Sequence, residues 1–210
     1  MQNELPDQSE LIEDLSANRE EALAKYFLLV RERLRRVVNF RLDYRLSGRV
    51  SESDVLQETF VRAAKRIDSY LSKPEMPFFV WLRLETQQQI LDIHRQHFSA
   101  GKRDIRKEIS LVPPKQNSDR TSMALAAHLV GKLTSPSQLF AKAEKIATLE
   151  KTLNTMNALD REVIALRHFE ELSNEETAEV LNIKPSAASK RYLRALKRLR
   201  EIMDVNHPSS

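Results

Sequence analysis

The chain has 210 residues, of which 34 are Lys or Arg and 30 are Asp or Glu, so its formal net charge is only +4. It contains no cysteine, which excludes disulfides, thiol nucleophiles and thiolate metal sites. Its three glycines (Gly48, Gly101 and Gly131) are too few and too scattered for a glycine-rich phosphate-binding loop. The abundance of Leu, Arg, Glu and Ala favours helices over strands.

The beginning of the chain is acidic and polar over residues 1–16, unlike the basic and then apolar order of a signal peptide. No run of apolar residues approaches the roughly 18 that a membrane span needs. We therefore expect no membrane insertion and a cytoplasmic location.

Three helices are predicted in the first half of the chain. Residues 10–46 carry apolar side chains at steps of three and four, with arginines between them. Short polar and acidic residues at 51–54 are typical of a helix start, and the helix after them ends near Ser72, ahead of two prolines. A third helix is expected from about Pro77 to Phe98.

The helical pattern decays between residues 99 and 137. This segment begins with basic residues, contains Pro113-Pro114 and is then rich in Ser, Asn, Gln and Thr. We predict a flexible linker here, with one short helical segment around Met123–Val130. The predicted fold is all-α, with two helical domains at residues 10–98 and 138–205 joined by this linker.

Two local patterns predict the helices that follow the linker. Asp160 is of a type that often begins helices, so we expect it to cap a helix over residues 161–169. Ser173, followed three residues later by Glu176, has the spacing of a capping box and predicts a short helix over residues 174–181.

The last helix has the clearest separation of apolar and basic residues. A turn at residues 182–184 precedes Pro185, which suits the first position of a helix because its missing N–H is not needed there. Seven basic residues and no acid lie between Lys184 and Arg200. The expected buried stripe, at steps of four and three, consists of Ala188, Tyr192, Ala195, Leu199 and Ile202.

Two short helices, a tight turn and a basic outer face are typical of a helix-turn-helix whose second helix enters the DNA major groove. Lys and Arg side chains on one face attract phosphates, and the residues near the start of the helix reach base edges. The simpler alternative is a solvated basic face. The predicted duplex-binding residues are Ser186, Ser189, Lys190, Arg191, Arg194, Lys197 and Arg198.

Residues 159–201 resemble region 4 of the sigma-70 family of RNA polymerase sigma factors, extracytoplasmic-function (ECF) subgroup. The matching motifs include R-E-V at 161–163, F-E-x-L-S at 169–173 and K-R-L-R at 197–200. Thr177, Asn182 and Ala187 replace the Ile, Gly and Thr that are usual there. The resemblance implies that the last helix binds the −35 promoter element.

A second resemblance lies in the first domain. The segment S-E-S-D-V-L-Q-E-T-F-V-R-A-A at 51–64 is similar to sigma region 2, in which D-x-x-Q-E-T-F-x-x-A is characteristic. In that family this face binds the coiled coil of the polymerase β′ subunit. The resemblance therefore implies a polymerase-binding site made of Asp54, Gln57, Glu58 and Phe60.

The following helix resembles the promoter-melting segment of the family, W-L-x-x-I-A-x-N-x-x-x-D-x-x-R, with Glu85, Thr86 and Gln88 in place of Ile, Ala and Asn. Extruded bases need aromatic faces, amides and guanidinium groups. For the aromatic side chains, core packing is the alternative role. The candidate −10 residues are Phe79, Trp81, Arg83, Gln87, Gln88, Arg95, Lys102 and Arg103.

The two resemblances together predict an alternative sigma factor rather than an enzyme, since catalysis belongs to the polymerase. Its expected partners are core RNA polymerase, through the β′ and β subunits, promoter DNA and an anti-sigma factor, with no cofactor. His94 and His97 lack a third ligand of suitable spacing, so no metal is expected. The alternatives are a dimeric helix-turn-helix regulator that acts without polymerase, and a helical adaptor with no nucleic-acid role.

Overall fold

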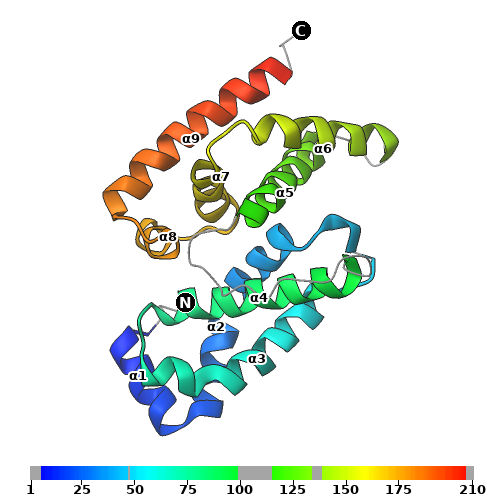
Figure 1. The fold of residues 1–210 in the computed structure, drawn as a ribbon. Coiled ribbons are helices and arrows are strands. Elements are labelled where there is room, and N and C mark those ends of the chain that lie inside the picture. The colour runs from blue at the N-terminus through cyan, green and yellow to red at the C-terminus, as the bar shows by residue number, and fades with distance from the viewer. Residues whose placement is uncertain (1–5, 47, 99–114, 134–138, 207–210) are drawn as a thin grey trace. The chain divides into compact units, whose positions relative to one another are not determined.

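The computed structural model describes residues 6–46, 48–98, 115–133 and 139–206, and every regular element within these ranges is helical (Figure 1). The chain divides into two units, residues 1–104 and 105–210. The prediction of an all-α chain with two helical domains is confirmed.

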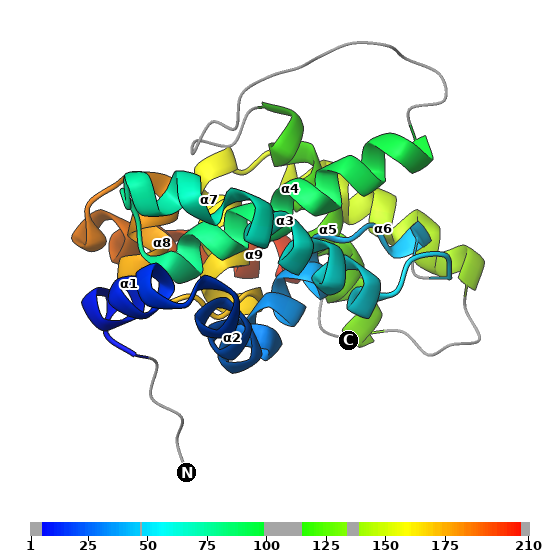
Figure 2. The ribbon, with the colours of Figure 1, turned by 90° about the horizontal axis from the view of Figure 1, so that it is seen from below.

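The first unit contains α1 (Gln8–Ala17), α2 (Arg19–Arg41), the 3₁₀ turn Tyr44–Leu46, α3 (Glu52–Ser72) and α4 (Phe78–Phe98). Helices α2, α3 and α4 pack against one another, and α1 lies on α2 (Figures 1 and 2).

The prediction of one helix over residues 10–46 is wrong. Asn18 leaves the helical conformation, with φ −144° and ψ 82°, and its side-chain amide donates to Glu21 Oε2 at 2.7 Å. Asparagine competes well with helix geometry through such local bonds. The apolar stripe nevertheless continues across the break, from Leu15 to Leu23, so periodicity alone could not reveal it.

Four aromatic side chains hold the first unit together where α2, α3 and α4 meet. Phe78 lies edge-on to Tyr26, with ring centroids 5.1 Å apart, and stacks on Trp81 at 5.3 Å. Tyr70 contacts both Phe78, at 5.1 Å, and Trp81, at 5.0 Å. These distances are typical of favourable aromatic pairs, so Trp81 has a packing role in the core.

The second unit contains α5 (Lys115–Leu133), α6 (Leu139–Leu153), α7 (Ala158–Ile164), a π-helical turn (Ala165–Phe169), α8 (Asn174–Leu181) and α9 (Pro185–Asn206). Helix α5 packs on α6 and α7, and α9 packs on α7 and α8. The predicted cap at Asp160 is wrong, because α7 begins earlier: Asn157 Oδ1 accepts from the Leu159 N–H at 2.9 Å. Both residues are of the capping type, and Asp160 lies within the first turn.

The predicted linker over residues 99–137 needs correction for residues 115–133, which form α5. Leu125, Ala126 and Val130 are buried, and the Thr121 hydroxyl donates to Glu162 Oε2 of α7 at 2.8 Å. The Ser122 hydroxyl donates to Asn154 Oδ1 at 2.7 Å. The helix is therefore longer than the predicted segment at 123–130 and forms part of the second unit. Residues 99–114 and 134–138 lie outside the described residues.

The contact between Thr121 and Glu162 gives a test of this assignment. We expect Thr121→Val, which keeps the side-chain shape and removes the donor, to lower the free energy of unfolding of the second unit by about 1–3 kcal/mol. Circular dichroism during urea unfolding measures the change. Trp81 is the only tryptophan of the chain and lies in the first unit, so the midpoint of its fluorescence transition should not move. Thr148→Val, the same substitution at an exposed position of α6, is the control. An equal midpoint for Thr121→Val and this control would contradict the assignment.

Candidate nucleic-acid and polymerase-binding surfaces

The helix-turn-helix of the second unit begins with the predicted capping box. The Glu176 N–H donates to Ser173 Oγ at 3.1 Å, and the Ser173 N–H donates to Glu176 Oε2 at 2.8 Å. Helix α8 ends at Asn182, which has the left-handed conformation φ 50°, ψ 50° that asparagine tolerates better than most residues. The Ile183 N–H then donates to the Ala178 carbonyl at 3.0 Å, which closes the turn before α9.

One residue that sequence reasoning missed connects α8 to the start of α9. The Asn174 side-chain amide donates to the Pro185 carbonyl at 2.9 Å, and its Oδ1 accepts from the Ser189 hydroxyl at 2.9 Å. Both bonds lie in the first two turns of α9, so they fix the direction in which this helix leaves the turn. Because these partners are 11 and 15 residues away, no local pattern in the sequence reveals them.

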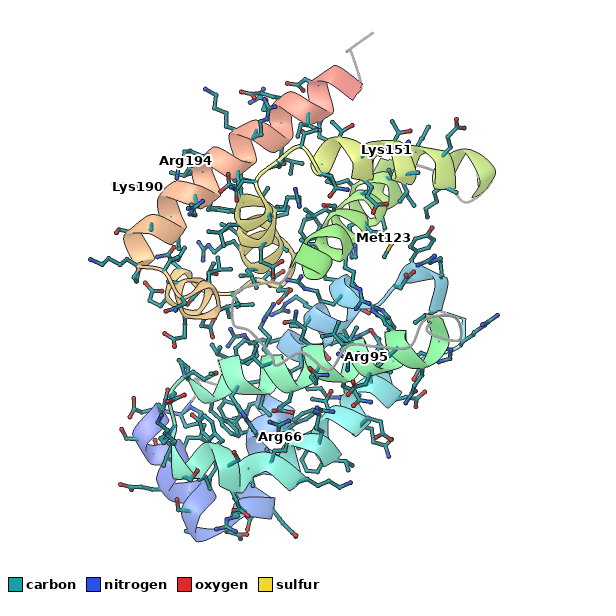
Figure 3. The ribbon with its side chains drawn as sticks, in the orientation of Figure 1. Arg66, Arg95, Met123, Lys151, Lys190 and Arg194 are labelled. Carbon is teal, nitrogen blue, oxygen red and sulfur yellow. The ribbon has the colours of Figure 1, made fainter. Side chains whose placement is uncertain are left out.

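The outer face of α9 carries most of the predicted duplex-binding side chains. Of the predicted stripe, Ala188, Ala195 and Ile202 are buried while Tyr192 and Leu199 are half-buried, so the inner side of the helix is the predicted one although the stripe is not buried throughout. Figure 3 shows Lys190 and Arg194 on the side of α9 that faces away from α7. The exposed residues of the predicted set are Ser186, Ser189, Lys190, Arg194, Lys197 and Arg198.

Two arginines of that set are held by carboxylates. Arg191 is half-buried, and its guanidinium lies 3.1 Å from Asp160 Oδ1 of α7. This ion pair anchors α9 on α7. Arg198 is exposed and lies 3.1 Å from Glu201, one turn further along the same helix, which leaves its charge on the solvent side.

The predicted polymerase-binding residues lie at the beginning of α3. Asp54, Gln57 and Glu58 are exposed, and their spacing of three and four places them on one face of the helix. The Asp54 N–H donates to Ser51 Oγ at 3.1 Å, which caps the helix at this face. Phe60 is half-buried and lies edge-on to Phe27 of α2, with centroids 5.3 Å apart.

The predicted −10 residues lie in α4, where the structure buries the aromatic ones. The Arg33 guanidinium stands 3.6 Å above the Phe79 ring, and Trp81 belongs to the aromatic cluster described above. Both rings are buried. Lys102 and Arg103 lie outside the described residues.

The polar −10 candidates follow one another along α4. Arg83 is buried and donates to Gln87 Oε1 at 3.3 Å. Gln88 is 9% exposed and donates to Asp92 Oδ1 at 3.1 Å. The side chain of Arg95 is 52% exposed and lies 2.8 Å from the same carboxylate, which makes it the most accessible of the group within the described residues.

The short connection before α4 is held by the side chain of Tyr70. Its hydroxyl donates to the Met76 carbonyl at 2.8 Å, and the Gln8 amide donates to the same carbonyl at 3.3 Å. Burial raises the pKa of Tyr70 to about 12, so the hydroxyl keeps its proton at neutral pH.

Within the described ranges, no group of three or more His, Cys, Asp or Glu side chains is arranged to hold a metal ion. His94 Nε2 accepts from the Asp43 N–H at 3.1 Å, which gives this histidine a structural role. In the same ranges no helix is both long and apolar enough to span a bilayer.

Three comparisons place this geometry among known proteins. A family model described as Sigma-70, region 4 matches residues 146–199, which include all of α7 and α8 and most of α9. The chain is 26% identical over 183 residues to the ECF RNA polymerase sigma factor SigE of Mycolicibacterium smegmatis, a match that covers 87% of this chain and 63% of SigE. It is 27% identical over 157 residues to the RNA polymerase sigma factor CnrH of Cupriavidus metallidurans, with 73% of each chain covered.

The fold has a counterpart among solved structures. CnrH in complex with the cytosolic domain of CnrY matches with a TM-score of 0.51 and 20% identity, over 94% of this chain and 97% of that one. The helix-turn-helix and its family match define a sigma-70 type DNA-binding domain. Residues 146–199 thus match region 4 of the sigma-70 family, and the chain as a whole is similar to the sigma factors SigE and CnrH.

Proposed function

We propose that the chain is an alternative ECF sigma factor, which binds core RNA polymerase through the β′ and β subunits and directs promoter-specific initiation. The observation that carries the proposal is the helix-turn-helix with an exposed basic helix, α9, most of which lies within the match to sigma-70 region 4. The chain spans 63% of the length of SigE, so its partners belong to this proposal.

In this proposal the two units bind different parts of the promoter. The exposed Lys190, Arg194 and Lys197 of α9 bind the phosphates of the −35 duplex, while the residues at the start of the helix reach base edges. The polar side chains of α4 hold the unpaired −10 strand. Because the chain binds the separated strand in preference to duplex, it stabilises the melted promoter. Bond formation belongs to the polymerase, so the chain itself performs no catalytic step.

The proposal also includes a protein that restrains the free chain. The CnrH structure contains the cytosolic domain of CnrY as a partner. We infer that this chain likewise has an anti-sigma partner that competes with the polymerase. Nothing in the described part of the chain favours the alternative of a dimeric regulator, which has no use for the exposed Asp54, Gln57 and Glu58 face of α3.

Binding to core polymerase tests the role of that face. We expect Asp54→Ala to weaken the affinity of the chain for core polymerase about tenfold, because the substitution removes an exposed charge from the proposed contact. Affinity for a DNA duplex should stay unchanged, since Asp54 lies in the other unit from α9. Fluorescence anisotropy with labelled core and with labelled duplex measures both. A loss of duplex affinity equal to the loss of core affinity would show that the faces are wrongly assigned.

A further inference from the structure

An ion-pair network joins α3 to α4 beside the side chains that we propose to bind the −10 strand. Glu85 Oε2 accepts from Arg62 Nε at 2.8 Å, and Glu85 Oε1 lies 3.3 Å from Arg66 Nε. The second end of the Arg62 guanidinium donates to Asp92 Oδ2 at 2.9 Å. Figure 3 shows Arg66 on α3 and Arg95 on α4, at opposite ends of this network.

Glu85 stands where the sigma-70 pattern has isoleucine, and its side chain is only 4% exposed. A buried carboxylate is costly unless cations pair with it, and here two guanidinium groups do so. An apolar residue would fill the same space between the helices without this requirement. Packing alone therefore does not explain why a charged residue stands at position 85.

Asp92, which is joined to Glu85 through Arg62, indicates what the role of this charge is. Asp92 Oδ1 accepts from Gln88 Nε2 at 3.1 Å and from Arg95 at 2.8 Å, while Oδ2 accepts from Arg62. A carboxylate has no hydrogen to donate, so the amide nitrogen of Gln88 must face it. The opposite end of the amide is Oε1, which can only accept a hydrogen bond.

We propose that Glu85 is a positioning residue, which acts through Arg62 and Asp92 to orient the Gln88 amide and thereby sets a base preference in the −10 strand. This inference rests on the proposed function and names a determinant of its specificity. At the exocyclic 6- or 4-position of a base, an accepting Oε1 selects the donating amino groups adenine N6 and cytosine N4 over the carbonyl oxygens guanine O6 and thymine O4, which only accept.

The network also predicts what happens when Asp92 is changed to asparagine. Arg62, held by the buried Glu85, continues to require an oxygen at the Oδ2 position. The new amide nitrogen of Asn must then take the place of Oδ1, where the exposed Arg95 can move aside. That nitrogen donates, so the Gln88 amide turns over and presents its own nitrogen to the strand. The base preference at this one position should reverse.

The test is transcription by core polymerase reconstituted with the full chain, on a pool of duplexes randomised upstream of the start site. Sequencing of the transcripts gives the base preferences at every promoter position. The variants are Asp92→Asn, Glu85→Gln, the double variant and Gln88→Met, which removes the amide without changing the charge. Asp68→Asn is the matched control, because Asp68 pairs with Arg19 at 2.8 Å between α2 and α3 but contacts no member of the network. Thermal unfolding shows whether each variant folds.

We expect one −10 position at which the wild type favours adenine or cytosine and Asp92→Asn favours thymine or guanine, each about fivefold. At this position Gln88→Met should remove the base preference, and Glu85→Gln should reduce it. The double variant Glu85→Gln/Asp92→Asn should not show the reversed preference of Asp92→Asn. The control and the −35 preferences should not change. If folded Asp92→Asn and Gln88→Met keep the wild-type preferences everywhere, the inference is overturned. A wild type that yields no enriched promoter would instead overturn the proposed function, and the inference with it.

Discussion

The double variant Lys190→Ala/Arg194→Ala should bind a −35 duplex about 10- to 100-fold more weakly than the wild type. Both side chains are exposed on the outer face of α9, and neither is held by a carboxylate of the described residues. Because each cation that leaves the interface reduces counterion release, the slope of log affinity against log salt should become shallower by about 0.9 for each phosphate that is no longer neutralised. Anisotropy titrations of a labelled promoter duplex at several salt concentrations measure both quantities.

The matched control removes the same charge from another helix of the same unit. Lys145 and Lys151 are exposed on α6, so Lys145→Ala/Lys151→Ala changes the net charge equally. We expect the affinity of this control to remain within about twofold of the wild type, since charges away from the interface are screened by salt. Equal losses in the two double variants would show that DNA binding depends on overall charge and not on the α9 face.

Arg161→Met should destabilise the second unit by about 2–3 kcal/mol, the largest effect on folding that we expect from a single substitution. Arg161 is 3% exposed, and its guanidinium donates to the Leu153 carbonyl at 3.0 Å and to the Met156 carbonyl. These two carbonyls lie at the end of α6 and just beyond it, where the regular i→i−4 donors of the helix run out, although the Leu153 carbonyl also accepts from the Met156 N–H at 2.9 Å. Methionine retains much of the apolar volume but leaves the carbonyls without this donor.

Urea unfolding followed by circular dichroism measures this loss. The fluorescence of Trp81 reports the first unit and should keep its midpoint. Arg200→Met is the control, because the side chain of Arg200 is 86% exposed and lies 3.9 Å from Asp204. An Arg161→Met variant as stable as this control would mean that the carbonyls at the end of α6 do not depend on Arg161.

Local chemistry explains which parts of the structure could be predicted from the sequence. The capping box at Ser173 and the turn that begins at Asn182 depend on neighbours within a few residues, and the sequence predicts both correctly. The orientation of α9 follows from the strict separation of Ala188 and Ala195 from Lys190 and its neighbours, and it was also correct. These features need no knowledge of distant residues.

The features that the sequence did not reveal depend on distant partners. Thr121 and Ser122 have the character of linker residues in the sequence, because their hydrogen-bond acceptors, Glu162 and Asn154, are 41 and 32 residues away. The pairing of Arg62 with Glu85 crosses 23 residues and two helices. From a single sequence a polar residue is predicted to be exposed, because the distant residue that pairs with it in the core cannot be identified.

The candidate binding residues also divide into those whose exposure the sequence predicts correctly and those for which it does not. The basic residues of α9 were predicted as exposed, and the structure places them so, with Arg191 partly withdrawn to Asp160. The −10 set follows from residue type and from the resemblance, and residue type alone cannot separate aromatic side chains of the core from those that bind a strand. Phe79 and Trp81 are buried, and Asp92, which joins Gln88 to Arg95, was not among the chosen residues.

Run-off transcription with purified core polymerase, with and without the full chain, tests the central claim most directly. Genomic DNA fragments of the source organism serve as templates, and the 5′ ends of the transcripts are mapped. The account predicts a small set of shared start sites that appear only when the chain is present, and that weaken with Asp54→Ala and with Lys190→Ala/Arg194→Ala. Start sites identical to those of core polymerase alone would contradict it.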